Sequence, residues 1–335
     1  MREASFYHVA PDGVLQCDLC RHYCRIRPSS SGLCRVRRNI EGKLFALTWG
    51  RAVAQAADPV EKKPLHHFMP GTMTWSFGAP GCNFRCANCQ NWQISQALPD
   101  DSVPLTTPEQ IVQNARLAGC ASISCTYTEP TIFAEYALET MMLSRQAGLK
   151  NIWVSNGYLS KICLDAIRPW LDAINVDLKS MDDAFYRRMC SARLDPVLDS
   201  LRQIRRSGIH LEITTLLIPG HSDDPAMLER LASFIANDLG AETPWHVTPF
   251  WPEISWKMEE TPPTSSEMIE KAWEIGRKAG LSSIYAGKAH SDTLCPQCGA
   301  RLVARTTAPF NGYLIERFDD GGRCPACRVP SPIRD

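Results

Sequence analysis

The chain has 335 residues, of which 44% are hydrophobic and 21% charged, enough apolar material for one large domain with an appendage or for two domains. Its 36 basic and 36 acidic residues cancel, so the charge gives no reason to expect a nucleic acid or a membrane as partner. The first residues lack the apolar core of a signal peptide, and no apolar run is long enough to span a membrane, so we expect a cytoplasmic protein.

Residues 1–72 are predicted to form an N-terminal cysteine-rich segment. The chain has 15 cysteines and no secretion signal, which favours metal ligands over disulfides. The stretch "CDLCRHYCRIRPSSSGLC" supplies the first set: Cys17, Cys20, Cys24 and Cys34. Four thiolates suit zinc, and they also suit an auxiliary iron–sulfur cluster that relays electrons, so both metals remain open here.

Residues 73–290 alternate short apolar runs with amphipathic helical stretches. Runs such as "ASISCTYT", "NIWVSNG" and "AINVDLK" are typical of buried strands, whereas "EQIVQNARLAG" spaces its apolar residues three and four apart. Capping boxes predict helix starts at Thr107 with Gln110 and at Thr264 with Glu267. This alternation predicts an α/β fold, a partial (β/α)6 TIM-like barrel, with its chemistry at the C-terminal ends of the strands.

The stretch "GAPGCNFRCANCQNW", residues 78–92, follows the first strand of this array. It holds Cys82, Cys86 and Cys89 in a C-x-x-x-C-x-x-C run. Three thiolates would suit a zinc site completed by His66 or His67, or a [4Fe–4S] cluster with one iron left open for a ligand. We favour the cluster, because the motif and its β/α context agree.

This motif in this position resembles the radical S-adenosylmethionine (SAM) superfamily. The resemblance implies that the open iron binds SAM and that one electron cleaves it to a 5′-deoxyadenosyl radical, which abstracts hydrogen from a substrate. The stretches "DPVEKKPLHHFMPG", "GCNFRCANCQNWQIS" and "YTEPTIFAEY" and the terminal cysteine pairs resemble the radical SAM enzyme of the AmmeMemoRadiSam system. That family is similar to pyruvate formate-lyase activating enzyme, and its name implies Memo-like and AMMECR-like partners.

The same resemblance implies cofactor-binding residues at the strand ends. They lie in "TEP", "VSNG" and "DLK", which are similar to the G-G-E-P, D-T-N-G and D-L-K elements of the activating enzymes: Thr128, Glu129, Ser155, Asn156, Asp177 and Lys179. In the family the acidic residue of the first element meets the ammonium of SAM, a charge-assisted contact that Glu129 would make here. Asn88 replaces the usual aromatic residue before the third cysteine, so Phe84 or Trp92 is expected beside the adenine.

Residues 291–335 are predicted to form a C-terminal knuckle. Two C-x-x-C pairs with a hairpin and turn between them indicate a tetrahedral four-thiolate site of zinc-ribbon or rubredoxin type, with iron or an auxiliary cluster as the alternative. Its ligands would be Cys295, Cys298, Cys324 and Cys327. The four remaining cysteines are expected to be small buried hydrophobes: Cys120, Cys125, Cys163 and Cys190.

Three functional hypotheses follow. The first is a radical SAM enzyme that abstracts hydrogen from a protein or peptide, as glycyl-radical activating enzymes do, with a reductant such as flavodoxin or ferredoxin. The second is a radical SAM enzyme that acts on a small molecule. The third is a zinc-rich nucleic-acid-binding or scaffold protein whose central cysteines are structural; the neutral net charge and the polar strand ends argue against it.

Overall fold

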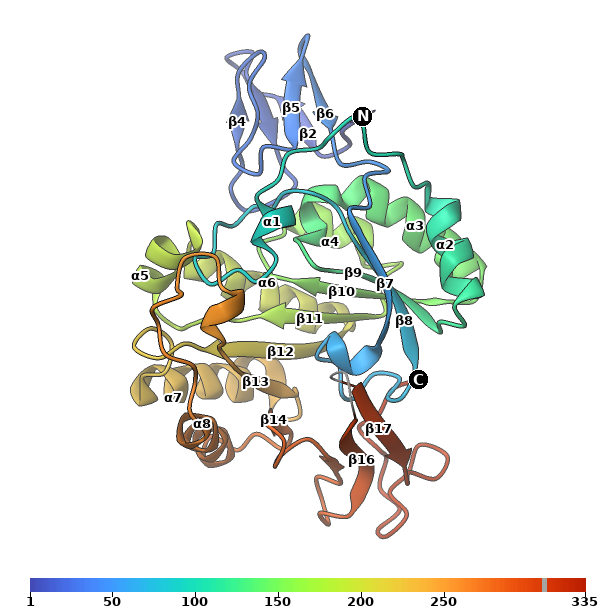
Figure 1. The fold of residues 1–335 in the computed structure, drawn as a ribbon, viewed down its shortest axis with the longest axis vertical. Helices are drawn as coiled ribbons and strands as arrows, with labels where there is room; N and C mark the ends of the chain where they lie inside the picture. Colours follow the sequence, from blue (N-terminus) through green and yellow to red (C-terminus); the bar gives the residue numbers. More distant parts are fainter. Residues whose placement is uncertain (309–311) are drawn as a thin grey trace.

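An eight-stranded sheet forms the centre of the protein (Figure 1), whose computed structural model describes residues 1–308 and 312–335. Its strands are β7 (Ala54–Pro59), β8 (Met73–Gly78), β9 (Ser122–Cys125), β10 (Lys150–Ser155), β11 (Ala173–Asp177), β12 (His210–Leu217), β13 (Trp245–Pro249) and β14 (Ile284–Ala286). Strands β8 to β14 are parallel and adjacent in chain order, and β7 adds an antiparallel edge. The predicted α/β partial barrel is confirmed, with β7 and β14 as its two edges.

Helices follow the sheet from α2 beside β8 to α8 beside β14 (Figure 1). The longer ones are α2 (Pro108–Leu117), α3 (Ala134–Gln146), α4 (Lys161–Ile167), α6 (Leu194–Ser207), α7 (Pro225–Phe234) and α8 (Ser266–Lys278). Shorter turns are α1 (Trp92–Ser95), α5 (Asp183–Phe185), η1 (Val60–Lys62), η2 (Pro130–Phe133), η3 (Tyr186–Cys190), η4 (Ile235–Gly240) and η5 (Pro252–Ile254). Within the described ranges, every helix is too short or too polar to cross a membrane.

The two predicted helix starts have different outcomes. The capping box of Thr107 and Gln110 is confirmed, since each side chain accepts a hydrogen bond from the backbone of the other residue. The box predicted at Thr264 is wrong, because Ser265 caps α8 instead. The hydroxyl of Thr264 donates to the carbonyl of Leu217 at the end of β12, so a tertiary contact uses the group that would otherwise cap the helix.

The N-terminal segment folds as two small sheets and also supplies β7. The sheets contain β1 (Arg2–Glu3), β6 (Lys43–Ala46) and β5 (Arg37–Ile40), and β2 (Tyr7–Val9), β3 (Leu15–Cys17) and β4 (Arg25–Ile26). Strand β7 has no local signal in the sequence, because "AQAADP" has none of the β-branched or aromatic residues that favour strands. Arg37 joins this segment to the barrel, since its guanidinium donates to both oxygens of Glu135 on α3 at 2.8 and 2.7 Å.

The C-terminal segment lies at the opposite end of the molecule from the N-terminal sheets (Figure 1). It contains β15 (Thr293–Leu294), β16 (Arg301–Ala308) and β17 (Gly312–Arg317). The predicted hairpin is confirmed by the antiparallel pairing of β16 with β17, while its turn, residues 309–311, lies outside the described residues. The buried guanidinium of Arg305 anchors the segment to the barrel by donating to the carbonyl of His66 at 2.6 Å.

Candidate functional site

The loop between β8 and α1 carries the three central cysteines. Gly81 opens this loop in the left-handed region, with φ of 93°, and a Cβ there would lie 2.7 Å from Cγ1 of Val36. Both the dihedral angle and the lack of space require glycine. The tight entry into the loop places Cys82, Cys86 and Cys89 in the wall of one cavity.

Two of these thiols have raised pKa values. Burial raises the pKa of Cys82 well above its ordinary value, and the charge of Glu129 adds to the effect, although the N–H of Phe84 donates to its sulfur at 3.3 Å. Burial also raises the pKa of Cys89, whose sulfur lies 3.3 Å from Oγ of Ser95. A metal that binds here must therefore displace protons from thiols that burial keeps neutral.

Cys86 differs from the other two because its pKa is lowered. The first cause is a hydrogen bond with the thiol of Cys190, and the positive charge of Lys179 also contributes. Cys190 belongs to η3, and its carbonyl accepts a 2.9 Å hydrogen bond from the N–H of Arg85 in the cysteine loop. The prediction of a small buried residue is right for Cys190, but its contact with Cys86 had no signal in the sequence because the two are far apart along the chain.

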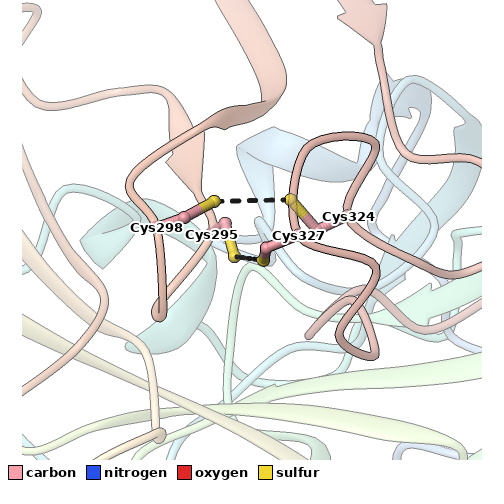
Figure 2. Close-up of side chains that lie close together, drawn as sticks. All are labelled: Cys295, Cys298, Cys324 and Cys327. Carbon is pink, nitrogen blue, oxygen red and sulfur yellow. Dashed lines mark hydrogen bonds between the residues drawn. The ribbon is translucent and has the colours of Figure 1, made fainter.

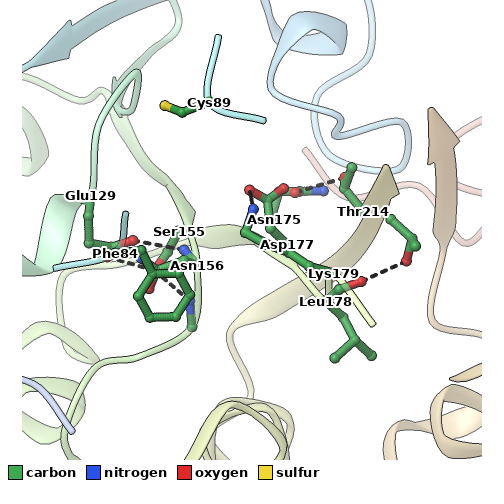
Figure 3. Close-up of polar contacts among 12 residues, drawn as sticks. Phe84, Cys89, Glu129, Ser155, Asn156, Asn175, Asp177, Leu178, Lys179 and Thr214 are labelled. Atoms are coloured by element: carbon green, nitrogen blue, oxygen red, sulfur yellow. Dashed lines mark hydrogen bonds and ion pairs between the residues drawn. The ribbon is translucent and has the colours of Figure 1, made fainter. Parts of the chain in front are cut away.

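Glu129 joins the C-terminal ends of β9 and β10 (Figure 3). Its Oε1 accepts hydrogen bonds from the N–H and hydroxyl of Thr131, at 3.0 and 2.6 Å, and from the hydroxyl of Ser155 at 2.8 Å. Its Oε2 accepts one bond, from the N–H of Asn156 at 2.8 Å, which leaves this oxygen a lone pair for a further donor. Burial raises the pKa of Glu129, and these donors oppose that rise.

Asp177 and Lys179 form an ion pair at the end of β11 (Figure 3), with 2.9 Å between Oδ2 and Nζ. Burial acts to lower the pKa of Lys179, but Asp177 and Cys86 raise it well above its ordinary value, so the ammonium stays charged. Beside the pair, the hydroxyl of Thr214 donates to Oδ1 of Asn175 at 2.9 Å. The wall of the cavity thus carries a fixed positive charge next to the cysteines.

All nine central residues predicted from the sequence line one cavity of about 580 Å³: Cys82, Cys86, Cys89, Thr128, Glu129, Ser155, Asn156, Asp177 and Lys179. This volume lies in the range of small-molecule sites. Phe84 also lines the cavity, whereas Trp92 is not among its described lining residues and stacks on Trp256. His66 and His67 are buried elsewhere, where their backbone N–H groups donate to Glu212.

The cavity fits a three-thiolate cluster with a polar ligand. Within the described part of the chain, the buried Oδ1 of Asn88 has no hydrogen-bond partner, and Asn88 faces the same cavity as the cysteines. A buried acceptor without a donor is costly unless a ligand supplies one. Three thiols, the open lone pair of Glu129 and this amide oxygen together suit an iron–sulfur cluster and a ligand that carries N–H donors.

Three residues that line the cavity, Asp58, Lys63 and Tyr127, were not among the site residues predicted from the sequence. Asp58 of β7 binds Nζ of Lys63 at 2.7 Å and the hydroxyl of Tyr127 at 2.9 Å, and all three residues line the cavity. Burial alone would raise the pKa of Asp58, but Lys63 and Tyr127 lower it to about 2. Asp58 belongs to β7, so predicting these contacts required that edge strand to be recognised.

The C-terminal cysteines form a compact set (Figure 2), as predicted for a four-thiolate site. All four sulfurs lie within 4.8 Å of one another. The contacts Cys295–Cys327 and Cys298–Cys324 are each 3.6 Å. A tetrahedron with metal–sulfur bonds of about 2.3 Å has edges of about 3.8 Å, so this set has room for one metal ion.

The N-terminal cysteines lie in β3 and in the loops on either side of β4. Cys17, Cys20 and Cys34 are buried, Cys24 is half-buried, and all four are free thiols. Burial raises the pKa of Cys20 well above its ordinary value, and the charges of the other three cysteines add to that rise.

Comparison with known proteins agrees with this geometry. The profile of the Radical SAM superfamily matches residues 77–232. The chain is 39% identical over 333 residues to the uncharacterized protein MJ0808 of Methanocaldococcus jannaschii, covering 98% of each chain. It is 20% identical over 222 residues to pyruvate formate-lyase 1-activating enzyme of Escherichia coli strain K12, covering 61% of this chain and 89% of that one.

Among solved structures, a radical SAM methyltransferase from Sphaerobacter thermophilus has a TM-score of 0.49 at 16% identity, covering 65% of this chain and 66% of that one. The matched profile begins in β8 and includes the three-cysteine loop and the ends of β9, β10 and β11. The cavity therefore lies in the part of the chain that belongs to the radical SAM superfamily of enzymes, residues 77–232.

Proposed function

We propose that the enzyme cleaves SAM reductively at a [4Fe–4S] cluster held by Cys82, Cys86 and Cys89 and abstracts hydrogen from a protein or peptide. The observation that carries this proposal is the single cavity in which the three thiols meet Glu129 and Lys179. When bound, the cluster and SAM supply one-electron chemistry that yields a 5′-deoxyadenosyl radical. The protein's own contribution is to bind, orient and shield.

The polar groups of the cavity suit the two ends of SAM. The lone pair on Oε2 of Glu129 is an acceptor for an ammonium, and Oδ1 of Asn88 is an acceptor for an exocyclic amine. The ammonium of Lys179 lies near Cys86 and favours the thiolate there. Hydrogen bonds within the protein already hold the side chains of Glu129 and Lys179 in place. These side chains therefore lose little conformational entropy when they bind and orient the ligand.

A macromolecular substrate is supported by the apolar surface next to the cysteine loop. Trp251 is 52% exposed and Ile254 is 50% exposed. Their segment contacts the cysteine loop, since the N–H of Lys257 donates to the carbonyl of Ala87 at 2.9 Å. Exposed apolar groups beside a site favour a protein partner, and the E. coli relative is named for the enzyme that it activates.

A small-molecule substrate is the second candidate, because of the charged residues in the cavity wall. The ion pair of Asp58 with Lys63 would complement a small polar molecule. Deuterium transfer from a labelled substrate into 5′-deoxyadenosine separates the two candidates, since only the true substrate donates the label. The third hypothesis, a zinc scaffold with structural central cysteines, is excluded by the family.

The proposal is tested with reconstituted protein under anaerobic conditions. With dithionite, flavodoxin or ferredoxin as reductant, we expect SAM to yield methionine and 5′-deoxyadenosine, slowly alone and faster with substrate. Memo-like and AMMECR-like proteins are the first substrates or partners to add. A fully loaded cluster that forms no 5′-deoxyadenosine with any reductant, with or without these proteins, contradicts the proposal.

We expect Glu129→Gln to weaken SAM binding by roughly 10- to 100-fold, the equivalent of one hydrogen bond to a charged group. The glutamine side chain carries no negative charge, and its NH₂ group would face a hydrogen-bond donor, either the hydroxyl of Ser155 or the N–H of Asn156. Equilibrium dialysis with labelled SAM measures the affinity, and iron and sulfide content checks that the cluster is intact. Unchanged affinity would place the ammonium contact at another residue.

We propose that the C-terminal set binds structural zinc, because its sulfur contacts match the edge of a zinc tetrahedron. Cys298→Ser removes one ligand, and Cys298 is the exposed member of the set, so the change perturbs packing least. We expect this variant to lose zinc and to melt several degrees lower, while its iron content stays unchanged. Metal analysis and thermal unfolding measure both effects; lost iron with zinc retained would refute zinc at this site.

A further inference from the structure

The cavity reaches far along the barrel from the cysteine loop. Strand β7 runs antiparallel to β8 and pairs Asp58 with Thr74, four residues before Gly78 at the end of β8. At about 3.3 Å per strand residue, the backbone of Asp58 lies about 13 Å along the sheet from the start of the cysteine loop. Four residues of β7 and its connection to β8 line this distant part of the cavity, which we call the floor: Asp58, Lys62, Lys63 and Pro64.

The interior of the barrel holds the floor in place. The side-chain amide of Asn175 donates to the carbonyl of Pro64 at 2.8 Å. Its oxygen accepts the hydroxyl of Thr214 at 2.9 Å (Figure 3). Asn175 lies two residues before Asp177 in β11, so the two side chains share one face of the strand, and both line the cavity. Contacts within the protein therefore fix the position of the floor.

Asp58 arranges the charged groups of the floor. Its Oδ2 accepts hydrogen bonds from Nζ of Lys63 at 2.7 Å and from the hydroxyl of Tyr127 at 2.9 Å. Its Oδ1 accepts a third bond from Nζ of Lys62 at 3.2 Å. The oxygens of Asp58 are thus engaged by donors of the protein, and one carboxylate with two ammonium groups gives the floor a net positive charge. The floor therefore favours an anionic ligand.

The ammonium of Lys63 has donors to offer that ligand. An ammonium carries three N–H groups. Among the residues that the structure describes, Asp58 is the one hydrogen-bond acceptor of its Nζ, and the ring of Tyr127 lies 5.0 Å from it. The side chain of Lys63 is 4% exposed and lines the cavity, so an acceptor reaches it from the cavity. Burial lowers the pKa of Lys63 and Asp58 opposes that fall; a bound anion would stabilise the ammonium in the same way.

Tyr127 connects the floor with the residues proposed to bind SAM. It adopts the left-handed conformation, with φ of 66°, which is unfavourable for a residue with a Cβ. Its carbonyl accepts a 2.8 Å hydrogen bond from the side chain of Asn91, two residues after Cys89. Glu129 follows two residues after Tyr127 in the same turn. One turn thus places a carboxylate in the upper part of the cavity and an aromatic ring over the lysine of the floor.

We propose that Lys63, assisted by Lys62, is a substrate-binding subsite and binds a carboxylate of the substrate. This inference rests on the proposed function, because the substrate must enter the cavity in which SAM is cleaved. Asp58 and Tyr127 are positioning residues that hold the ammonium toward the cavity. An acidic side chain or the chain terminus of a protein supplies the carboxylate, and so does a free small acid.

Binding of labelled SAM separates this subsite from the SAM site. In equilibrium dialysis of the reconstituted full chain, we expect Lys63→Met to leave the affinity for SAM nearly unchanged, whereas Glu129→Gln weakens it. The reason is that Lys63 lies on the floor, away from the cysteine loop and the turn that carries Glu129. An equal loss of affinity in both variants would assign Lys63 to the SAM site and overturn the proposal.

Calorimetric titration without reductant then measures carboxylate binding. The probes are two pairs that differ in a carboxylate against an amide: a capped glycine–aspartate–glycine peptide with its asparagine counterpart, and succinate with succinamide. We expect the wild type to prefer the carboxylate by roughly 10- to 100-fold, as for a hydrogen bond to a charged group. A preference for the aspartate peptide indicates a protein source, and a preference for succinate alone indicates a free acid. Equal binding of carboxylate and amide in both pairs would refute the subsite.

Matched variants tie this preference to Lys63. It should disappear in Lys63→Met and persist in Lys271→Met, which changes an exposed lysine of α8. Lys63→Arg retains the charge and should retain the preference. If Lys63→Met folds poorly because Asp58 loses its partner, the double variant Asp58→Asn with Lys63→Met removes both charges and should lose the preference. A folded variant without the Lys63 ammonium that still prefers carboxylates would overturn the proposal.

The same samples keep this inference separate from the proposed function. Addition of a reductant tests SAM cleavage through the formation of 5′-deoxyadenosine, whereas the titration needs no turnover. Carboxylate binding at Lys63 in a protein that never cleaves SAM would refute the proposed function and retain the anion site. SAM cleavage in a protein without carboxylate preference would retain the function and refute the subsite.

Discussion

Replacing Cys86 with alanine is expected to abolish SAM cleavage. Cys86 is one of the three thiols that we propose as cluster ligands, and its hydrogen bond with Cys190 and the charge of Lys179 lower its pKa. The variant should lose the iron and sulfide of that cluster and form no 5′-deoxyadenosine above background. Anaerobic metal analysis and chromatography of the products measure both effects.

Cys163→Ala is the matched control for this experiment. Cys163 is also fully buried, but it lies in α4 and not in the cavity wall, so its loss should leave the iron content unchanged and cost only packing energy. Cys82→Ala and Cys89→Ala should behave like Cys86→Ala. A Cys86→Ala protein that keeps a full catalytic cluster and cleaves SAM would show that the cluster is bound elsewhere.

The second large effect is expected from Glu135→Gln, on stability. Arg37 and Glu135 have exposed side-chain fractions of 1% and 6% and form a bidentate pair between β5 and α3. Removing the carboxylate charge leaves the guanidinium buried without compensation, which costs about 3–5 kcal/mol of unfolding free energy. Chemical denaturation measures this loss, and Glu274→Gln, in an exposed pair with Lys271, should change stability by less than about 1 kcal/mol.

The same pair predicts acid sensitivity. Burial acts to raise the pKa of Glu135, but Arg37 lowers it below its ordinary value. A carboxyl group whose pKa is lower in the folded state stabilises that state above its unfolded pKa and loses the contribution as pH falls through the folded pKa. We expect the stability difference between the wild type and Glu135→Gln to shrink at acid pH; a constant difference would show that the charge is not its source.

The sequence by itself determined the superfamily and the barrel. The spacing of Cys82, Cys86 and Cys89 after a strand is a local signal, because a tight loop brings residues three and four apart into the wall of one cavity. The strand runs and the Thr107 cap are also local, since periodicity and capping act within a few residues. The motif that contains Glu129 directly follows a predicted strand, and the polar site residues of a parallel barrel lie at the C-terminal ends of its strands.

Only the tertiary structure decided the contacts between distant segments. The thiol of Cys190 against Cys86, the edge strand β7 and the buried pair of Arg37 with Glu135 have no local pattern. The Thr264 box was wrong for the same reason, since a contact with β12 used its hydroxyl. The spacing of four cysteines along the chain also does not distinguish a zinc site from an iron–sulfur cluster. The structure decided that Cys295, Cys298, Cys324 and Cys327 come within 4.8 Å of one another, because the pairing of β16 with β17 brings the two distant cysteine pairs together.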